Sequence, residues 1–142
     1  MREIFYNLGK HDAALLRSEA ASLTGTEIIR RDMSIPAFDP AKDYSSWPAG
    51  APVTDEGQVW MLIQPYNAAN YTGRPSTLRA LWGLCHTKDA DKAKPWVEPY
   101  GTSGMYMKDE CYKDENGQVW RCLEDNMVYT AAALPAKWEA VA

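Results

Sequence analysis

The chain has 142 residues, a net charge of −4 and a pI near 5.1, which suits one domain or two small modules in line. Apolar residues make up 46% of it and charged residues 24%, a balance typical of folded chains. No block of Lys or Arg supplies the basic surface that nucleic-acid phosphates require. No segment approaches the roughly 20 apolar residues of a membrane span, and the first residues lack the apolar region of a secretion signal. We therefore expect no nucleic-acid partner, no membrane partner and no secretion by the standard route.

Residues 1–35 are predicted to form a helical arm for assembly or docking. Leu8, Leu15 and Leu16 recur at helical spacing, and Thr24 with Glu27 fits a capping box that starts a second helix. Pro36 ends this region. An amphipathic arm this short must pack its apolar face on its own chain or on another subunit, and the sequence leaves both alternatives open.

After Pro36 the chain becomes rich in Pro, Gly, Trp and Tyr, and apolar runs shorten, which is typical of short strands and hairpins. The tetrapeptide Gly-Gln-Val-Trp occurs at residues 57–60 and again at 117–120. The surrounding pattern of proline, aromatic residue, Tyr and closing Trp also recurs. We predict a mainly β fold: two tandem β-hairpin or three-stranded-sheet modules, at 36–87 and 95–142, joined by a charged linker at 88–94.

The second module contains the clearest turn signal, Asn116-Gly117, because both residue types tolerate positive φ. A two-residue turn there pairs Glu115 with Gln118 and places Cys111 opposite Cys122. A disulfide between these cysteines is conceivable, but free thiols suit a reducing compartment better. Trp60 and Trp120 lie in the middle of their strands and are interpreted as packing residues.

Three Cys and two His in this spacing match no recognised metal site, and no cofactor is expected. The adjacent Cys85 and His86 suggest either a nucleophile with its base or a half-buried thiol beside a surface imidazole. The carboxylates Asp55, Glu56, Asp114 and Glu115 fall in turns of small modules, where no cleft would desolvate an acid. We expect a protein that is not an enzyme.

Both modules resemble carbohydrate-binding modules of family 5/12, the small chitin-binding type found on chitinases and in phage tail proteins. The second copy carries the ordered motifs Pro95-Trp96, Tyr106, Asn116-Gly117-Gln118-Val119-Trp120, Cys122-Leu123 and Pro135-Ala136-Lys137-Trp138. The first copy carries Phe38, Tyr44, Gly57-Gln58-Val59-Trp60, Gln64-Pro65-Tyr66 and Arg79-Ala80-Leu81-Trp82. Asp109 stands where the family usually has Gly.

The resemblance implies that exposed aromatic side chains bind an insoluble polysaccharide. The closing tryptophans, Trp138 and Trp82, inherit the role of ligand contact, because an indole face covers the C–H face of a pyranose ring. Neighbouring aromatic, amide and hydroxyl groups would orient the sugar. The remaining candidates are Trp96, Tyr129, Asn126, Gln64 and Tyr66.

The arm is similar to the leader of some phage structural proteins that carry such modules. The expectation is therefore a non-enzymatic protein of a phage tail or baseplate that attaches to host-surface polysaccharide. Such a protein is assembled in the host cytoplasm, acts outside the cell as part of the virion, and contacts other virion proteins and further copies of itself. The alternative is a virion structural or decoration protein that uses the same modules for protein contacts.

Overall fold

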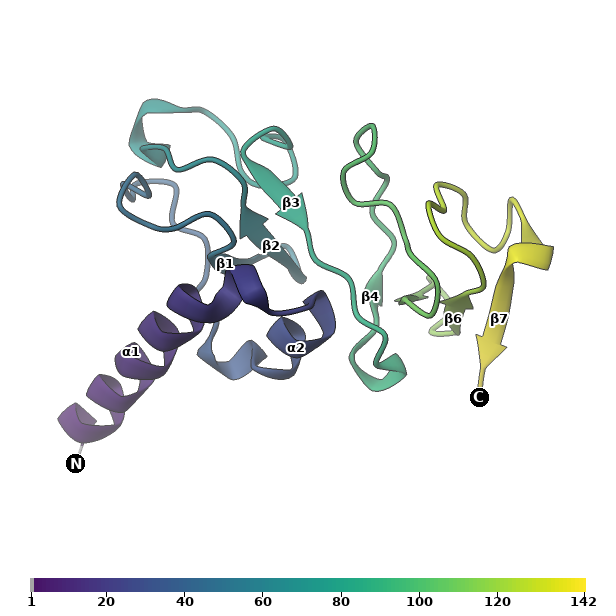
Figure 1. Ribbon diagram of the computed structural model, residues 1–142, viewed down its shortest axis with the longest axis horizontal. Helices are drawn as coiled ribbons and strands as arrows, with labels where there is room; N and C mark the ends of the chain where they lie inside the picture. The colour runs from purple at the N-terminus through teal and green to yellow at the C-terminus, as the bar shows by residue number, and fades with distance from the viewer. Residues whose placement is uncertain (1) are drawn as a thin grey trace.

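The computed structural model describes the backbone of residues 2–142 and the side chains of residues 11–142. Two helices, α1 (Arg2–Glu19) and α2 (Gly25–Arg30), precede two separate β-sheets (Figure 1). The first sheet has the order β1-β2-β3 and the second β4-β5-β6-β7. Strands outnumber helices in the described chain, which agrees with the β-rich fold that we expected. The strands are β1 (Pro52–Asp55), β2 (Gln58–Leu62), β3 (Trp82–Leu84), β4 (Lys94–Pro95), β5 (Cys111–Lys113), β6 (Val119–Cys122) and β7 (Trp138–Val141).

The predicted capping box at the start of α2 is confirmed. The Thr24 hydroxyl accepts a hydrogen bond from the Glu27 backbone N–H at 3.2 Å, and the Glu27 carboxylate accepts one from the Thr24 N–H at 3.0 Å. These bonds satisfy two backbone donors that a helix start leaves free. The pKa of Glu27 is lowered, chiefly because its carboxylate accepts from the Thr24 backbone N–H and also because of the Thr24 side chain.

The helical region packs on its own chain from Leu16 onward, which is one of the two arrangements considered. Leu16, Ile28 and Ile29 are fully buried and lie against Val59 of β2 and Cys85. The first turns of α1 extend away from both sheets (Figure 1). None of the described helices is both long enough and apolar enough to cross a membrane.

The first sheet is built on a tight hairpin. Asp55 at the end of β1 pairs with Gln58 at the start of β2, so Glu56 and Gly57 alone form the turn. Their φ values of 52° and 75° are those of a two-residue turn whose twist matches the strands. β3 adds to β2 with Trp82 opposite Leu62.

A set of aromatic rings fills the core of the first sheet. Phe38 and Tyr44 stack with centroids 5.9 Å apart, and Trp82 meets Tyr44 edge-on at 5.4 Å. The Trp82 indole N–H donates to the Tyr66 hydroxyl at 2.8 Å, and the Asp39 N–H donates to the Tyr44 hydroxyl at 2.8 Å. Edge-to-face pairs of this kind add stability beyond the area they bury.

The second sheet contains a similar set of rings. Trp96 and Tyr106 stack at 4.8 Å, and Trp138 meets Tyr106 edge-on at 5.6 Å. The Trp138 indole N–H donates to the Tyr129 backbone carbonyl at 2.9 Å. Both sheets thus enclose the closing tryptophan of a Pro-x-x-Trp or Arg-x-x-Trp segment between other rings.

The register predicted for the second hairpin is wrong by one residue. Cys111 lies opposite Arg121, not Cys122, and Tyr112 lies opposite Trp120. Neighbouring residues of a strand point to opposite faces, so Cys111 and Cys122 lie on opposite faces of the sheet. All three cysteines are buried free thiols.

The side chain of Asp114 explains this register. Its carboxylate accepts from the backbone N–H groups of Asn116 and Gln118, both at 2.9 Å. Gly117, with φ of 83°, then closes a three-residue loop instead of the two-residue turn that Asn-Gly predicts by itself.

The charged segment 88–94 lies against the helical region. The Lys88 N–H donates to the Thr26 hydroxyl at 2.8 Å, and the Lys92 ammonium lies 3.3 Å from the Asp32 carboxylate. Gln58 of β2 donates from its amide to the Pro95 carbonyl of β4 at 2.8 Å. These contacts connect the second sheet to the first half of the chain.

His86 links the two halves and is not the surface imidazole that we expected. Only 9% of the residue is exposed, its ring stacks on Tyr106 at 3.7 Å, and Nε2 lies 2.8 Å from the Gly104 carbonyl oxygen. Burial lowers the pKa of His86 to about 4. The imidazole is therefore neutral near pH 7 and donates from Nε2 to Gly104.

His86 predicts an acid-sensitive stability. An unfolded His binds a proton near pH 6.5, whereas folded His86 resists protonation until about pH 4. The unfolded state therefore binds more protons in this window, and the free energy of unfolding falls with falling pH by up to about 1.4 kcal/mol per pH unit. Urea unfolding of the wild type and of His86→Gln between pH 8 and 4 measures the pH dependence of the free energy of unfolding.

The difference between the two stability curves is the readout. Glu110 has a raised pKa because burial disfavours its charge, so it contributes a change of opposite sign, but it is present in both proteins and cancels. The His86→Gln difference should shrink as the pH falls below 6.5, and parallel curves would contradict the prediction.

Candidate ligand-binding site

The residues that the sequence nominated for carbohydrate binding do not form one surface. Three of them are buried: Trp82 with 0% of its surface exposed, Trp138 with 4% and Tyr66 with 6%. Trp96 is half-buried, and the others are exposed, Tyr129 at 56%. Gln64, Tyr66 and Trp82 belong to the first half of the chain, and Trp96, Asn126, Tyr129 and Trp138 to the second.

The expectation that Trp82 and Trp138 hold their ring faces outward is wrong. Trp138 meets Tyr112 edge-on at 4.9 Å and Tyr106 at 5.6 Å, and Trp82 is enclosed in the same way by Tyr44 and other rings. A module of this size without disulfides needs large apolar side chains in its core. The closing tryptophans fulfil this role, so their faces are not available to stack on a sugar.

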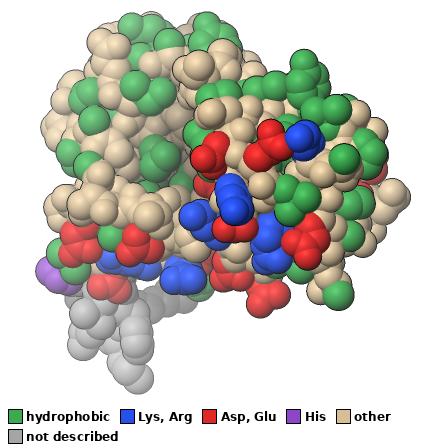
Figure 2. Space-filling model, turned by 45° about the vertical axis from the view of Figure 1, so that its right-hand side comes forward, with side chains coloured by type: hydrophobic (Ala, Val, Ile, Leu, Met, Phe, Trp, Pro, Cys, Tyr) green, Lys and Arg blue, Asp and Glu red, His purple; other side chains and the backbone are tan. Residues whose placement is uncertain are grey.

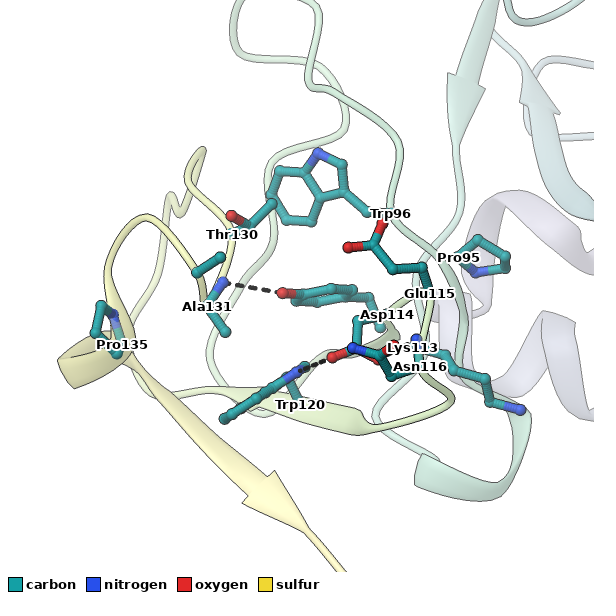
Figure 3. A pocket seen from close by; sticks show the side chains of 12 residues that line it. Pro95, Trp96, Lys113, Asp114, Glu115, Asn116, Trp120, Thr130, Ala131 and Pro135 are labelled. Atoms are coloured by element: carbon teal, nitrogen blue, oxygen red, sulfur yellow. Dashed lines mark hydrogen bonds between the residues drawn. The ribbon is translucent and has the colours of Figure 1, made fainter.

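A cavity of about 720 Å³ opens on the second sheet. The half-buried indoles of Trp96 and Trp120 lie on opposite sides of it (Figure 3). Buried Tyr112 of β5 also lines the cavity, and its hydroxyl accepts from the Ala131 N–H at 2.9 Å. The cavity is lined by Pro95, Trp96, Tyr112, Lys113, Asp114, Glu115, Asn116, Trp120, Thr130, Ala131, Ala132 and Pro135.

Trp96 is fixed from several directions. It stacks on Tyr106, and meets Tyr112 at an interplanar angle of 69°. Its indole N–H donates to the Glu98 carboxylate at 2.8 Å. These contacts define the plane of the ring that borders the cavity.

Trp120 is oriented by the same carboxylate that shapes the hairpin loop. Its indole N–H donates to Asp114 at 3.0 Å, while Asn116 and Gln118 donate to the other carboxylate oxygen. These hydrogen bonds, that of Trp120 foremost, keep the pKa of Asp114 below its ordinary value. The side chain is therefore a charged acceptor throughout the neutral range.

The rim of the cavity is polar and more acidic than basic. Lys113, Asp114 and Glu115 are the charged residues that line it, and Asn116 and Thr130 add uncharged polar groups. Elsewhere, acidic and basic side chains are interspersed over the face shown in Figure 2, without a large patch of one sign. A cavity with apolar walls and a few polar groups at its rim is typical of small-molecule and sugar sites.

The matching face of the first sheet is closed. Trp60, paired with Val53 as Trp120 is with Tyr112, is 1% exposed. The guanidinium carbon of Arg79 lies 5.3 Å from the centroid of its ring. Arg74 donates to both carboxylate oxygens of Asp55, at 2.9 and 3.2 Å.

Sequence reasoning missed Trp120, Tyr112 and Asp114 as members of a site. The position of Trp120 in the middle of its strand predicts a packing residue, as it does for Trp60 in the repeated tetrapeptide. One signal in the sequence separates them: residues 63–81 contain Arg74 and Arg79, whereas the shorter segment 123–137 contains no Arg. The cover over Trp60 therefore has no counterpart over Trp120.

Cys85 and His86 do not form a nucleophile with its base. The Cys85 thiol donates to the Gly25 carbonyl and His86 contacts the Gly104 carbonyl, so the two side chains have different partners. Burial raises the pKa of Cys85 to about 12, which keeps the thiol protonated and unreactive. Among the side chains of residues 11–142, no group of three or more His, Cys, Asp or Glu is placed to hold a metal ion.

No protein-family model and no curated protein matches the chain. The assignment of a role to the cavity therefore depends on its geometry and chemistry.

Asp114→Ala should loosen this side of the cavity. The substitution removes the acceptor of the Trp120 indole and of two loop N–H groups. We expect faster amide hydrogen exchange at Asn116 and Gln118 and stronger acrylamide quenching of the total tryptophan fluorescence, because Trp120 becomes more accessible.

Asp125→Ala is the matched control, because the Asp125 carboxylate accepts from the Lys108 N–H in a different loop. Unchanged exchange at Asn116 and Gln118 in Asp114→Ala would show that the carboxylate does not hold this loop.

Proposed function

We propose that the chain is a non-enzymatic polysaccharide-binding protein whose binding site is the Trp96–Trp120 cavity. One observation carries the proposal: two half-buried indoles border a single cavity of about 720 Å³ with a polar rim. Indole faces bind the C–H faces of sugar rings by dispersion and partial desolvation. The rim groups Asn116 and Thr130 are placed to hydrogen-bond sugar hydroxyls.

The proposal includes the tandem organisation. The repeated tetrapeptide, the similar hairpins and the two sets of stacked and edge-on rings support an origin of both sheets from one module similar to family 5/12. Under this proposal the first module has become a structural support. Arg79 covers the ring of Trp60, which is the counterpart of Trp120, and Arg74 pairs with Asp55 and Glu56 beside it. The second module retains an open face.

A single site of this size is expected to bind weakly, with Kd on the order of micromolar to millimolar. Several copies of the chain in one assembly would raise the overall affinity without new contacts. This suits the proposed setting, a phage tail or baseplate that meets a repetitive host-surface polysaccharide.

Trp120→Ala and Trp96→Ala test the site. Each should lower binding by about tenfold or more, because removal of a central aromatic contact commonly has an effect of this size. Cosedimentation with insoluble chitin, cellulose and bacterial cell wall measures the loss, and circular dichroism checks the fold. Because Trp96 also packs on Tyr106, Trp120→Ala is the more decisive variant.

Trp47→Ala is the control, since Trp47 is also half-buried but lies under the Arg17 guanidinium at 4.4 Å, and it does not line the cavity. A folded Trp120→Ala variant that binds as well as the wild type would contradict the proposed site.

A second candidate function is protein docking through α1 in a virion structural or decoration protein. The observation in its favour is that the first turns of α1 extend beyond the rest of the chain (Figure 1). The two functions are compatible, because α1 and the cavity lie in different parts of the chain.

Removal of residues 2–10 tests the docking role and spares Leu16 and Ala20, which pack in the core. If the arm mediates self-association, the full chain should form oligomers in light scattering and the truncated chain should be monomeric. The affinity of a single site for a short soluble oligosaccharide should be unchanged, because the described residues that line the cavity lie between 95 and 135. The same number of chains per particle in both proteins would contradict self-association through the arm.

A further inference from the structure

The two sheets present equivalent carboxylates beside equivalent indoles. In the first, Asp55 ends β1 and its backbone carbonyl accepts from the Trp60 indole at 3.2 Å. In the second, Asp114 follows β5 and its carboxylate accepts from the Trp120 indole at 3.0 Å. A Glu comes next in each chain segment, Glu56 in the first turn and Glu115 in the second.

In the first sheet, cationic groups of the chain itself occupy this place. Arg74 lies 2.9 Å from Asp55 and 3.1 Å from Glu56. Arg79 covers the face of Trp60 at 5.3 Å and donates to the Glu98 carbonyl at 2.9 Å. Arg74 gains from charge-assisted hydrogen bonds to the carboxylates, and Arg79 gains from the attraction of a cation to the indole ring.

Among the side chains of residues 11–142, no cation lies over Trp120 or pairs with Asp114 or Glu115 in the second sheet. The segment 123–137 has a single basic residue, Lys137, which pairs with Glu124 at 2.6 Å outside the cavity. Among the described side chains, the Glu115 carboxylate makes no hydrogen bond or ion pair. The charged residues that line the cavity are Asp114, Glu115 and Lys113, and the segment 130–135, which also contributes to the lining, carries no ionisable side chain.

We propose that the cavity selects polysaccharides with free amino groups, such as deacetylated hexosamine polymers. The sugar ring faces one indole, and its ammonium group lies beside Asp114 and Glu115, the place that corresponds to that of the Arg74 guanidinium beside Asp55 and Glu56 in the first sheet. Two carboxylates against one ammonium leave this rim attractive to a cation, whereas an acetylated amine loses both the charge and the ion pair. This inference depends on the proposed polysaccharide site and specifies its ligand.

The test compares two soluble probes of equal length, a glucosamine hexamer and an N-acetylglucosamine hexamer, by isothermal titration at pH 6. The wild type should bind the amine hexamer about tenfold more tightly. Glu115→Gln should reduce this preference severalfold, and the preference should fall as the pH rises through the pKa of the sugar amine.

Glu139→Gln is the matched control, because it removes the same charge from an exposed position opposite Arg121, on the other face of the sheet. It should retain the preference, whereas an equal loss in both variants would mean unspecific attraction to an acidic protein and would overturn the inference. Equal affinity for both hexamers would overturn the inference and leave the polysaccharide site standing. Binding of neither hexamer, nor of the insoluble polymers, would overturn the polysaccharide site itself.

Discussion

The edge-to-face packing of one tryptophan in each sheet is the interaction on which the rest of the structure depends. Trp82 and Trp138 meet stacked aromatic pairs at nearly perpendicular angles, 89° to Tyr44 and 71° to Tyr106. Sheets this small bury little surface, and the described chain has no disulfide to support them. Large, rigid side chains with few rotatable bonds supply the core instead. Because these rings lie in the interior, a polysaccharide bound as proposed would contact the half-buried indoles of Trp96 and Trp120 instead.

Two local differences then decide which sheet has an open face. The second hairpin loop has one more residue than the first, and the Asp114 side chain holds it in shape. The segment before the last strand is shorter and lacks arginine. As a result Trp60 is 1% exposed under Arg79, while Trp120 borders a cavity. The same framework therefore supports a closed unit and an open one, and the difference lies in the segments and side chains that surround it.

The sequence predicted the features that depend on local chemistry. The capping box at Thr24 and Glu27 and the β-rich texture after Pro36 follow from residue types at short range. The register of the second hairpin was not predicted correctly. The Asp114 carboxylate accepts from the N–H groups of Asn116 and Gln118 and stabilises a three-residue loop, whereas Asn-Gly by itself predicts a two-residue turn. The burial of Trp138 could not be predicted from the residues next to it in sequence either, because an indole can equally pack in a core or stack on a sugar ring. Only the placement of Tyr106 and Tyr112 around it distinguishes the two.

The cavity is a property of the whole chain and not of the second sheet alone. Trp96 forms one wall, and its backbone is held on both sides by the first half: Gln58 donates to the Pro95 carbonyl, and Arg79 donates to the Glu98 carbonyl. His86 packs on Tyr106, which in turn stacks on Trp96. The closed first sheet thus positions a wall of the open site. Under the proposed function, the first sheet therefore contributes by positioning Trp96, and the second sheet contributes the open face that binds polysaccharide.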